Sequence, residues 1–206
     1  MSSFEIVPFE AEYQSAVGAL FDAGLRKQGD TPTLLALQNW FVESKLKSDM
    51  GDIYSYYMAN KSDEDSATTT VTGGLTFFVA LIENQVVGCV GIQNCSYSQE
   101  PDDKHSDVYD SIQPNEVCEL VRMSVSSDCR GQYIGTAMVN KVEEWALSKH
   151  MKKIVISTLS AMSPARRLYE SMGYQLRIET EIENMVSFLG EGNYEKVYVA
   201  HYIKTL

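Results

Sequence analysis

The sequence is poor in cysteine and has no paired-cysteine motif. It holds 206 residues and four cysteines, and no C-x-x-C spacing occurs among them. This spacing fits no zinc-binding pattern. Cys89, Cys95 and Cys118 lie in or near apolar segments, where a free thiol behaves as a small hydrophobic side chain. We therefore expect free thiols and a reducing, cytoplasmic location.

Basic residues are also scarce. Lys and Arg number 17 against 28 Asp and Glu, which gives a formal net charge of −11. A nucleic-acid-binding surface needs a basic stripe, so the charge balance argues against a nucleic-acid partner. An acidic surface suits a cationic partner such as an amine, although surface acidity mostly serves solubility.

We expect neither a secretory leader nor a membrane-spanning segment. Its start, MSSFEIVPFE, has neither the basic nor the apolar region of a signal peptide. The most apolar stretch, Leu75 to Ile92, is interrupted by Glu83-Asn84-Gln85 and is too short on each side to span a bilayer. We expect no membrane partner.

The chain contains enough apolar residues to form one hydrophobic core. They make up 44% of the chain, and the length suits a single domain over residues 1–206. Alternating and helical hydrophobic patterns predict a mixed order of elements. Strands are expected at 4–9, 76–82, 86–93, 117–125, 153–159, 174–182 and 196–203, and helices at 13–28, from Thr31-Pro32 onward, briefly at 52–58, from Gly135 onward and at 163–172. This order predicts an α/β fold with helices on both faces of the sheet.

Two polar segments interrupt the pattern. Lys61 to Gly74 is rich in Ser, Asp and Thr and is typical of a surface loop. Ser96 to Asn115 is long and acidic. It either borders the substrate or is a solvated loop, and the sequence does not decide between the two.

The most informative stretch is Glu119 to Thr136, ELVRMSVSSDCRGQYIGT. It predicts a strand that runs into a glycine-spaced turn and then a helix. Strict alternation predicts one strand face with Val117, Glu119, Val121, Met123 and Val125, and the other with Cys118, Leu120, Arg122 and Ser124. A helix start exposes backbone N–H groups and the positive end of the peptide dipoles, so the segment is a candidate phosphate cradle. The alternative is an ordinary strand–turn–helix joint.

The turn resembles that of the GNAT superfamily of N-acetyltransferases, which binds the pyrophosphate of acetyl-CoA with the motif R/Q-x-x-G-x-G/A. Here it is Arg130-Gly131-Gln132-Tyr133-Ile134-Gly135. Tyr133 replaces the first glycine, which keeps the backbone N–H but narrows the space beside it. Dinucleotide-binding and P-loop patterns need a different spacing or a Gly-Lys-Ser/Thr sequence.

ELVRMSVSSDCRGQYIG, LYESMGY and KSDMGDIYSYY together resemble the camello-like branch of that superfamily, which includes aspartate and cysteine-conjugate N-acetyltransferases. The resemblance implies a GNAT fold, with about seven strands and two splayed parallel strands that hold acetyl-CoA. Several members carry a membrane segment where Gly29 to Lys47 here predicts an amphipathic helix. We therefore do not extend membrane attachment to this chain.

Glu119 is the candidate general base. It aligns with a glutamate that is the base in several relatives, and apolar neighbours raise the pKa of a carboxyl group toward neutrality. The alternative is a structural glutamate paired with Arg122 or a backbone amide. The predicted faces make the pairing with Arg122 unfavourable, and Glu116 is the second candidate for the base.

Tyr169 is the candidate general acid. Its helix carries Ala165, Leu168, Tyr169 and Met172 on one stripe, which by pattern alone indicates a core position. The tyrosine of L-Y-E-x-x-G-F/Y in the resembled family points at the sulfur of CoA. Met162 occupies the place of a CoA-contacting asparagine in many relatives, and Ser163 is expected only to cap the helix.

The resemblance also implies which residues make the remaining contacts with acetyl-CoA. The backbone of Met123, Ser124 and Val125 is expected to bind the pantetheine arm. The turn residues Arg130, Gly131, Gln132, Tyr133, Ile134, Gly135 and Thr136 are expected to bind the diphosphate.

Arg122 either meets a substrate carboxylate or is a structural arginine. The three histidines, His105, His150 and His201, are scattered, and no metal is required.

Together these features predict direct acetyl transfer from acetyl-CoA to a primary amine, such as an amino acid or a cysteine conjugate, in a ternary complex. Two alternatives remain. One is a protein or peptide N-acetyltransferase whose acidic segment Glu100 to Asp110 docks a basic peptide. The other is a non-catalytic acyl-CoA sensor. Dimers are frequent in this fold, so a homodimer is also open.

Overall fold

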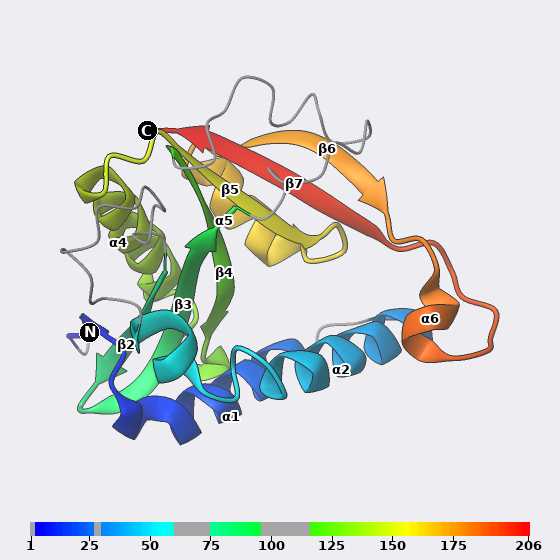
Figure 1. Cartoon of the computed structure of the whole chain (residues 1–206), viewed down its shortest axis with the longest axis horizontal. Coiled ribbons are helices and arrows are strands. Elements are labelled where there is room, and N and C mark those ends of the chain that lie inside the picture. Colours follow the sequence, from blue (N-terminus) through cyan, green and yellow to red (C-terminus); the bar gives the residue numbers. More distant parts are fainter. Residues whose placement is uncertain (1–2, 27–29, 60–74, 96–115) are drawn as a thin grey trace, which may run out of the picture.

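One mixed sheet organises the molecule (Figure 1). The computed structural model describes residues 3–26, 30–59, 75–95 and 116–206. Within these ranges seven strands lie in the order β1-β2-β3-β4-β5-β7-β6, as the predicted fold class requires. The strands are β1 (Glu5–Pro8), β2 (Thr76–Ile82), β3 (Gln85–Asn94), β4 (Val117–Val125), β5 (Lys153–Leu159), β6 (Gln175–Glu181) and β7 (Tyr198–Thr205). β4 and β5 are parallel, and all other neighbouring strands are antiparallel.

Helices cover both faces of this sheet. They are α1 (Gln14–Leu25), α2 (Pro32–Leu46), α4 (Ile134–Ser148), α5 (Ser163–Ser171) and the short α6 (Met185–Leu189), with single turns at Ala11–Tyr13, Tyr54–Met58 and Ser127–Cys129. One apolar cluster joins Met138 of α4 and Tyr169 of α5 to β4 and β5. A second joins Phe21 of α1 and Val42 of α2 to β2 and β3. Each face therefore has its own core.

Local signals placed most element ends within about two residues of their positions in the structure. Thr31 caps α2 by accepting a hydrogen bond from the Leu34 N–H at 3.3 Å, and Pro32 begins the helix. Glu83 and Asn84 both have positive φ and connect β2 to β3, which confirms the predicted hairpin. Two local predictions were wrong or incomplete. Met162 rather than Ser163 is the N-cap of α5, and α6 was not predicted.

The strict alternation predicted for β4 is wrong. Ser124 pairs with Cys89 and Val121 pairs with Gly91, so β4 carries one extra residue, and Arg122 has a φ of +56°. This bulge turns Met123 and Val125 toward the α4 cluster, whereas Val121 packs with the α1 and α2 cluster. Met123 therefore does not share a face with Glu119.

β4 and β5 separate at the middle of the sheet. Their pairing runs from Val117–Lys153 to Leu120–Ile156 and then ends, although β4 continues to Val125. Figure 1 shows the two strands diverging beyond this point. The predicted splay is confirmed, and it leaves the β5-facing edge of the second half of β4 without a strand partner in the described part of the chain.

The remaining predictions concern two loops, the cysteines and membrane-spanning helices. The loop predicted at Lys61 to Gly74 and the acidic segment Ser96 to Asn115 lie outside the described residues. The four cysteines carry free thiols. In the part of the chain that the structure describes, no helix has the length and apolar character that crossing a membrane requires.

Candidate active site

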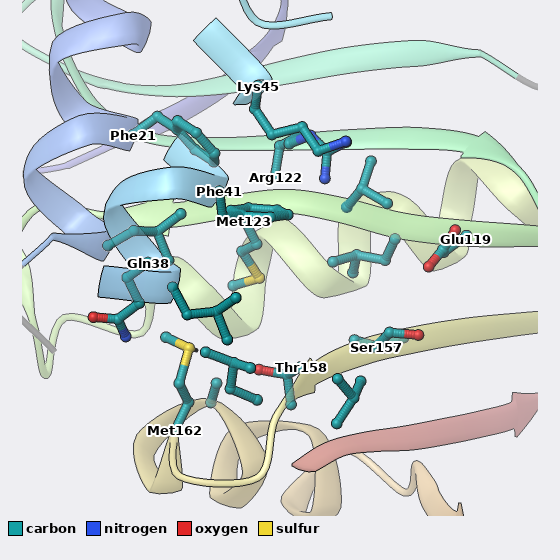
Figure 2. A pocket seen from close by; sticks show the side chains of 18 of the residues that line it. Phe21, Gln38, Phe41, Lys45, Glu119, Arg122, Met123, Ser157, Thr158 and Met162 are labelled. Carbon is teal, nitrogen blue, oxygen red and sulfur yellow. Dashed lines mark hydrogen bonds between the residues drawn. The ribbon is translucent and has the colours of Figure 1, made fainter. Parts of the chain in front are cut away.

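A cavity of about 430 Å³ lies where β4 and β5 diverge (Figure 2). Residues of α1, α2, α5 and α6 complete its walls, and the lining is mostly apolar. Besides the aromatic residues Trp40 and Tyr169, its polar side chains are few: Gln38, Lys45, Gln93, Glu119, Arg122, Ser157 and Thr158. A largely apolar cavity with a few convergent polar groups is the usual form of a small-molecule site.

Glu119 is buried in this cavity, with 6% of its surface exposed. Gln93, directly opposite on β3, donates from Nε2 to Glu119 Oε2 at 2.8 Å. Burial raises the pKa of Glu119 above its usual range, against smaller lowering effects from Gln93, Arg122, Ser157 and Lys45. The carboxyl group thus has the raised proton affinity of a candidate base, and Gln93 was not found from the sequence.

Arg122 points toward Asp49 from the β4 bulge. Its Nε lies 2.7 Å from Asp49 Oδ2, and its second contact is between Nη2 and Oδ1 at 3.4 Å. Tyr57 also donates to Asp49 Oδ2, at 2.6 Å. Burial alone would raise the pKa of Asp49, but the hydrogen bonds and charges of Arg122, Tyr57 and Lys45 together lower it. The Arg122 guanidinium is thus paired with Asp49, and no ion pair between Glu119 and Arg122 occurs among the described residues.

Lys45 is a second cation at the same wall of the cavity. The Nζ of Lys45 and the guanidinium of Arg122 each lie 5.5 Å from the centre of the Phe41 ring. Figure 2 shows the two side chains next to each other above the cavity. Burial, followed by repulsion from Arg122, lowers the pKa of Lys45. Lys45 lies on α2, and nothing in the helical pattern distinguished it from a solvated lysine.

Gln38 adds an unpaired group to the lining. Its side chain is 3% exposed, and Oε1 has no hydrogen-bond partner among the described residues. A buried carboxamide oxygen without a partner is unfavourable. A ligand N–H in the cavity would remove that penalty.

Tyr169 enters the cavity from α5. Its hydroxyl lies 3.9 Å from the Sδ of Met123, and burial raises its pKa, so the proton stays on the oxygen at neutral pH. A thioether sulfur is a weak acceptor, so this hydroxyl can exchange partners at little cost. Met162 also lines the cavity, where its Sδ lies 3.8 Å from Thr158 Oγ1.

The predicted phosphate turn lies outside the cavity, between β4 and α4. Gly131 and Tyr133 have φ values of +79° and +61°, and α4 begins at Ile134 without a side-chain cap. The Tyr133 side chain is 73% exposed, so it points away from the packed part of the turn. A Cβ added at Gly135 would meet Leu168 at 3.2 Å and Met123 at 3.3 Å, which explains the need for glycine there.

Four predicted residues thus line one cavity: Glu119, Arg122, Met123 and Tyr169. The other predicted residues are not among those that line it. Ser124 is buried, Val125 packs toward α4, Arg130 is exposed, and Gln132 and Thr136 are half-buried beside the start of α4. The described residues contain no cluster of three metal-ligating side chains.

The strand order, the divergence of β4 from β5 and the cavity at that point are features of an acyltransferase fold. The model of the acetyltransferase (GNAT) family matches residues 34–174, and the chain belongs to this family. It is 34% identical over 134 residues to the N-acetylaspartate synthetase of Xenopus tropicalis, covering 65% of this chain and 39% of that protein. It is 32% identical over 143 residues to N-acetyltransferase 8 of Rattus norvegicus, covering 68% and 53%.

A Xenopus laevis relative carries the camello name and is 29% identical over 129 residues, which cover 63% of this chain and 46% of the relative. These matches confirm the resemblance to the camello-like branch. The chain aligns with about two fifths to one half of the length of these relatives.

Solved structures support the fold. A Salmonella typhimurium protein assigned as an acetyltransferase and solved with its cofactor acetyl-CoA superposes with a TM-score of 0.64 at 12% identity, over 98% of this chain and 94% of that chain.

Proposed function

We propose that this protein is an N-acetyltransferase that transfers the acetyl group of acetyl-CoA to a small primary amine carrying a carboxylate. The observation that carries the proposal is the cavity at the β4–β5 splay, where Glu119 lies across from Arg122 and Lys45. A proton acceptor and two cations in one small cavity are what an amino acid requires for binding and deprotonation.

Acetyl-CoA would bind along the splay. The β5-facing edge of Met123 to Val125 is where the pantetheine arm would add as a strand, and the start of α4 would receive the diphosphate. The left-handed conformations of Gly131 and Tyr133 are of the kind that forms anion-binding backbone turns, so N–H groups here would face the diphosphate. Acetyl-CoA supplies the activated acyl group, and no metal is invoked.

Glu119 would take the proton from the substrate ammonium, because only the free amine attacks a thioester. Its raised pKa, caused first by burial, improves its match to that task. Backbone N–H groups at the β4 bulge would stabilise the oxyanion. The Tyr169 hydroxyl, buried beside Met123, would donate to the leaving thiolate.

Lys45 and the remaining Arg122 donors would bind the carboxylate of the substrate. Two Arg122 nitrogens already contact Asp49, whereas Lys45 forms no ion pair among the described residues. An anion beside Lys45 would relieve the unfavourable surroundings that lower its pKa. The unpaired Gln38 oxygen would accept from an N–H of the substrate or of pantetheine.

The size of the cavity, about 430 Å³, favours a small acceptor over a peptide. Trp40 of α2 and Phe188 of α6 pack with ring centres 4.6 Å apart and planes tilted by 51°, and both line the cavity. The acidic segment that would dock a basic peptide lies outside the described residues. Free thiols at all four cysteines agree with the proposed cytoplasmic location.

The test measures thiol release from acetyl-CoA with matched amines. Aspartate, other amino acids and cysteine S-conjugates are compared with their carboxamides, and CoA binding is followed by calorimetry. We expect turnover with acids and at least tenfold lower kcat/KM with amides. Equal rates with acids and amides would refute carboxylate recognition. CoA binding without turnover of any amine would establish the sensor alternative, and no CoA binding would refute both functions.

A further inference from the structure

A line of polar side chains crosses the sheet from Glu119 to its edge. The four neighbouring strands β4, β5, β7 and β6 each contribute one residue to it. The residues are Glu119, Ser157, His201 and Thr180. Their surroundings on this side of the sheet include the apolar cluster of Val117, Val155 and Ile203. Buried polar side chains among apolar neighbours destabilise a protein unless they form hydrogen bonds with one another.

The outer part of the line is hydrogen-bonded. Ser157 Oγ lies 3.1 Å from His201 Nδ1, and Thr180 Oγ1 lies 2.8 Å from His201 Nε2. Ser157 and His201 are direct partners in the antiparallel pairing of β5 with β7. His201 is only 5% exposed, and both of its ring nitrogens are engaged by hydroxyl groups.

The inner part of the line joins Ser157 to the candidate base. Glu119 pairs with Val155 across the parallel strands, which places Ser157 two positions further along β5 on the same face. Both side chains line the cavity, and Figure 2 shows them on the two facing strands. Hydrogen bonding from Ser157 is one of the effects that lower the pKa of Glu119.

We propose that Ser157 and His201 extend the base, so that the proton Glu119 removes from the amine passes through Ser157 Oγ to His201 Nδ1. This proposal rests on the proposed function. In the transfer, the O–H bond of the Glu119 carboxyl breaks and a new O–H bond forms at Ser157. The original hydroxyl proton of Ser157 leaves for Nδ1, which yields a Glu119 carboxylate and an imidazolium.

The heavy atoms of Ser157, His201 and Thr180 need not move in this exchange. With a neutral imidazole, Ser157 donates to Nδ1 and accepts from the Glu119 carboxyl group. With an imidazolium, Nδ1–H donates to Ser157, and Ser157 donates to the Glu119 carboxylate. Nε2–H donates to Thr180 in both states, so the Ser157–His201 and Thr180–His201 distances serve both.

The advantage of this relay is that Glu119 returns to its carboxylate form before the reaction ends. The ammonium loses one proton before it attacks, and the tetrahedral intermediate must lose a second from the same nitrogen. With the first proton on His201, the Glu119 carboxylate can accept the second. The cations Arg122 and Lys45 and the amide of Gln93 face Glu119 and favour its carboxylate form. After product release the second proton leaves Glu119 through the cavity, and the first then returns from His201 by the same path. One of the two replaces the proton that Tyr169 gave to the CoA thiolate, and the other passes to solvent.

Ser157 and His201 are therefore positioning residues that act through Glu119. The test compares Ser157→Ala, Ser157→Thr and His201→Asn with matched surface controls. His150→Asn is the control for the histidine, because His150 is exposed and its positive φ suits asparagine. Ser171→Ala removes an exposed hydroxyl in the same way.

We expect Ser157→Ala and His201→Asn each to lower kcat about tenfold or more, with KM and the CoA dissociation constant within about twofold. The double variant should be no worse than either single one, because the two residues act as a unit. Ser157→Thr and both controls should retain most of kcat. Unchanged kcat in His201→Asn, or additive losses in the double variant, would overturn the relay while leaving the transferase function intact.

A second measurement needs no turnover. In protein with isotope-labelled histidine, the ring signals of His201 are identified by their loss in His201→Asn, or by their isolation in a His105→Asn, His150→Asn double variant. Glu119→Gln should change the pH titration of these signals, and Ser157→Ala should remove that response. A His201 titration that is the same in wild type and Glu119→Gln would show that no proton is shared.

Discussion

Asp49 and Arg122 form a buried ion pair between positions 73 residues apart in the sequence. The Asp49 side chain is 4% exposed and that of Arg122 is 12% exposed, with Nε and Oδ2 2.7 Å apart. The pair joins the KSDMGDIYSYY segment to the ELVRMSV strand, which resemble the same family in separate stretches of sequence. It therefore fixes the end of α2 against the β4 bulge that lines the cavity.

Removing the carboxylate of this pair should destabilise the protein strongly. Asp49→Asn leaves the Arg122 guanidinium buried without its counterion, and such losses cost about 3–5 kcal/mol. Asp22→Asn is the control, because Asp22 pairs with Arg26 at the surface and such pairs contribute at most about 1 kcal/mol. Urea unfolding at pH 7 measures both. Equal losses in the two variants would contradict the structural role of the buried pair.

The effect of Asp49→Asn should depend on pH. The folded state lowers the pKa of Asp49, so its stabilisation is complete above the ordinary carboxyl pKa of about 4 and is lost as pH falls through the lower folded value. The difference in unfolding free energy between wild type and Asp49→Asn should therefore shrink below about pH 4. Unfolding curves at pH 7, 5 and 3 test this, and a difference that grows toward low pH would contradict the pairing.

The elements that the sequence predicted correctly are those set by neighbouring residues. Thr31-Pro32 starts α2 through its own hydroxyl and ring, and Glu83-Asn84 turns the hairpin through its own backbone. Glu119 and Tyr169 were identified by family motifs, and the structure places both at one cavity. Their catalytic roles remain predictions.

What the sequence could not predict depends on pairing between distant segments. The β4 bulge at Arg122 arises from the register with β3, so alternation alone assigned Met123 to the wrong face. Lys45 and Gln93 belong to the cavity because α2 and β3 pack beside β4. The sequence pattern did not connect His201 to other polar residues, because its hydroxyl partners come from two other strands.

Replacing Glu119 by glutamine should remove activity and raise stability at alkaline pH. Loss of the base should lower kcat about 10²- to 10³-fold and flatten the low-pH limb of the rate profile. Burial raises the folded-state pKa of Glu119, so its favourable contribution to stability is complete below about pH 4 and is lost as pH rises through that folded value. Glutamine is uncharged at every pH.

Glu119→Gln should therefore unfold at higher denaturant concentration than wild type at pH 8, and this advantage should disappear toward pH 4. An unchanged low-pH limb would reassign the base to another group. A variant that is inactive and also less stable at pH 8 would instead indicate a structural role.

Replacing Tyr169 by phenylalanine should separate chemistry from binding. Among the described residues the hydroxyl hydrogen-bonds only with the weak acceptor Met123 Sδ, at 3.9 Å, so its loss should cost under about 1 kcal/mol of stability. We expect kcat to fall about tenfold or more and the CoA dissociation constant to stay within about twofold. Tyr198→Phe, at an exposed site on β7, is the control. Equal losses of kcat and CoA affinity would refute the proton-donor role.

The exchange of Tyr133 for glycine tests whether the departure from the family motif impairs cofactor binding. Tyr133 already has the left-handed φ of +61° and a side chain that is 73% exposed. Glycine would relieve about 1 kcal/mol of backbone strain and add a similar chain entropy to the unfolded state. We therefore expect Tyr133→Gly to leave stability within about 1 kcal/mol and CoA affinity within about threefold.

Gly131→Ala provides the contrast, because alanine opposes the φ of +79°, and CoA affinity should fall about fivefold or more. Calorimetric titration with CoA measures both variants. A gain of more than tenfold in Tyr133→Gly would show instead that the tyrosine side chain folds back over the turn and obstructs the diphosphate.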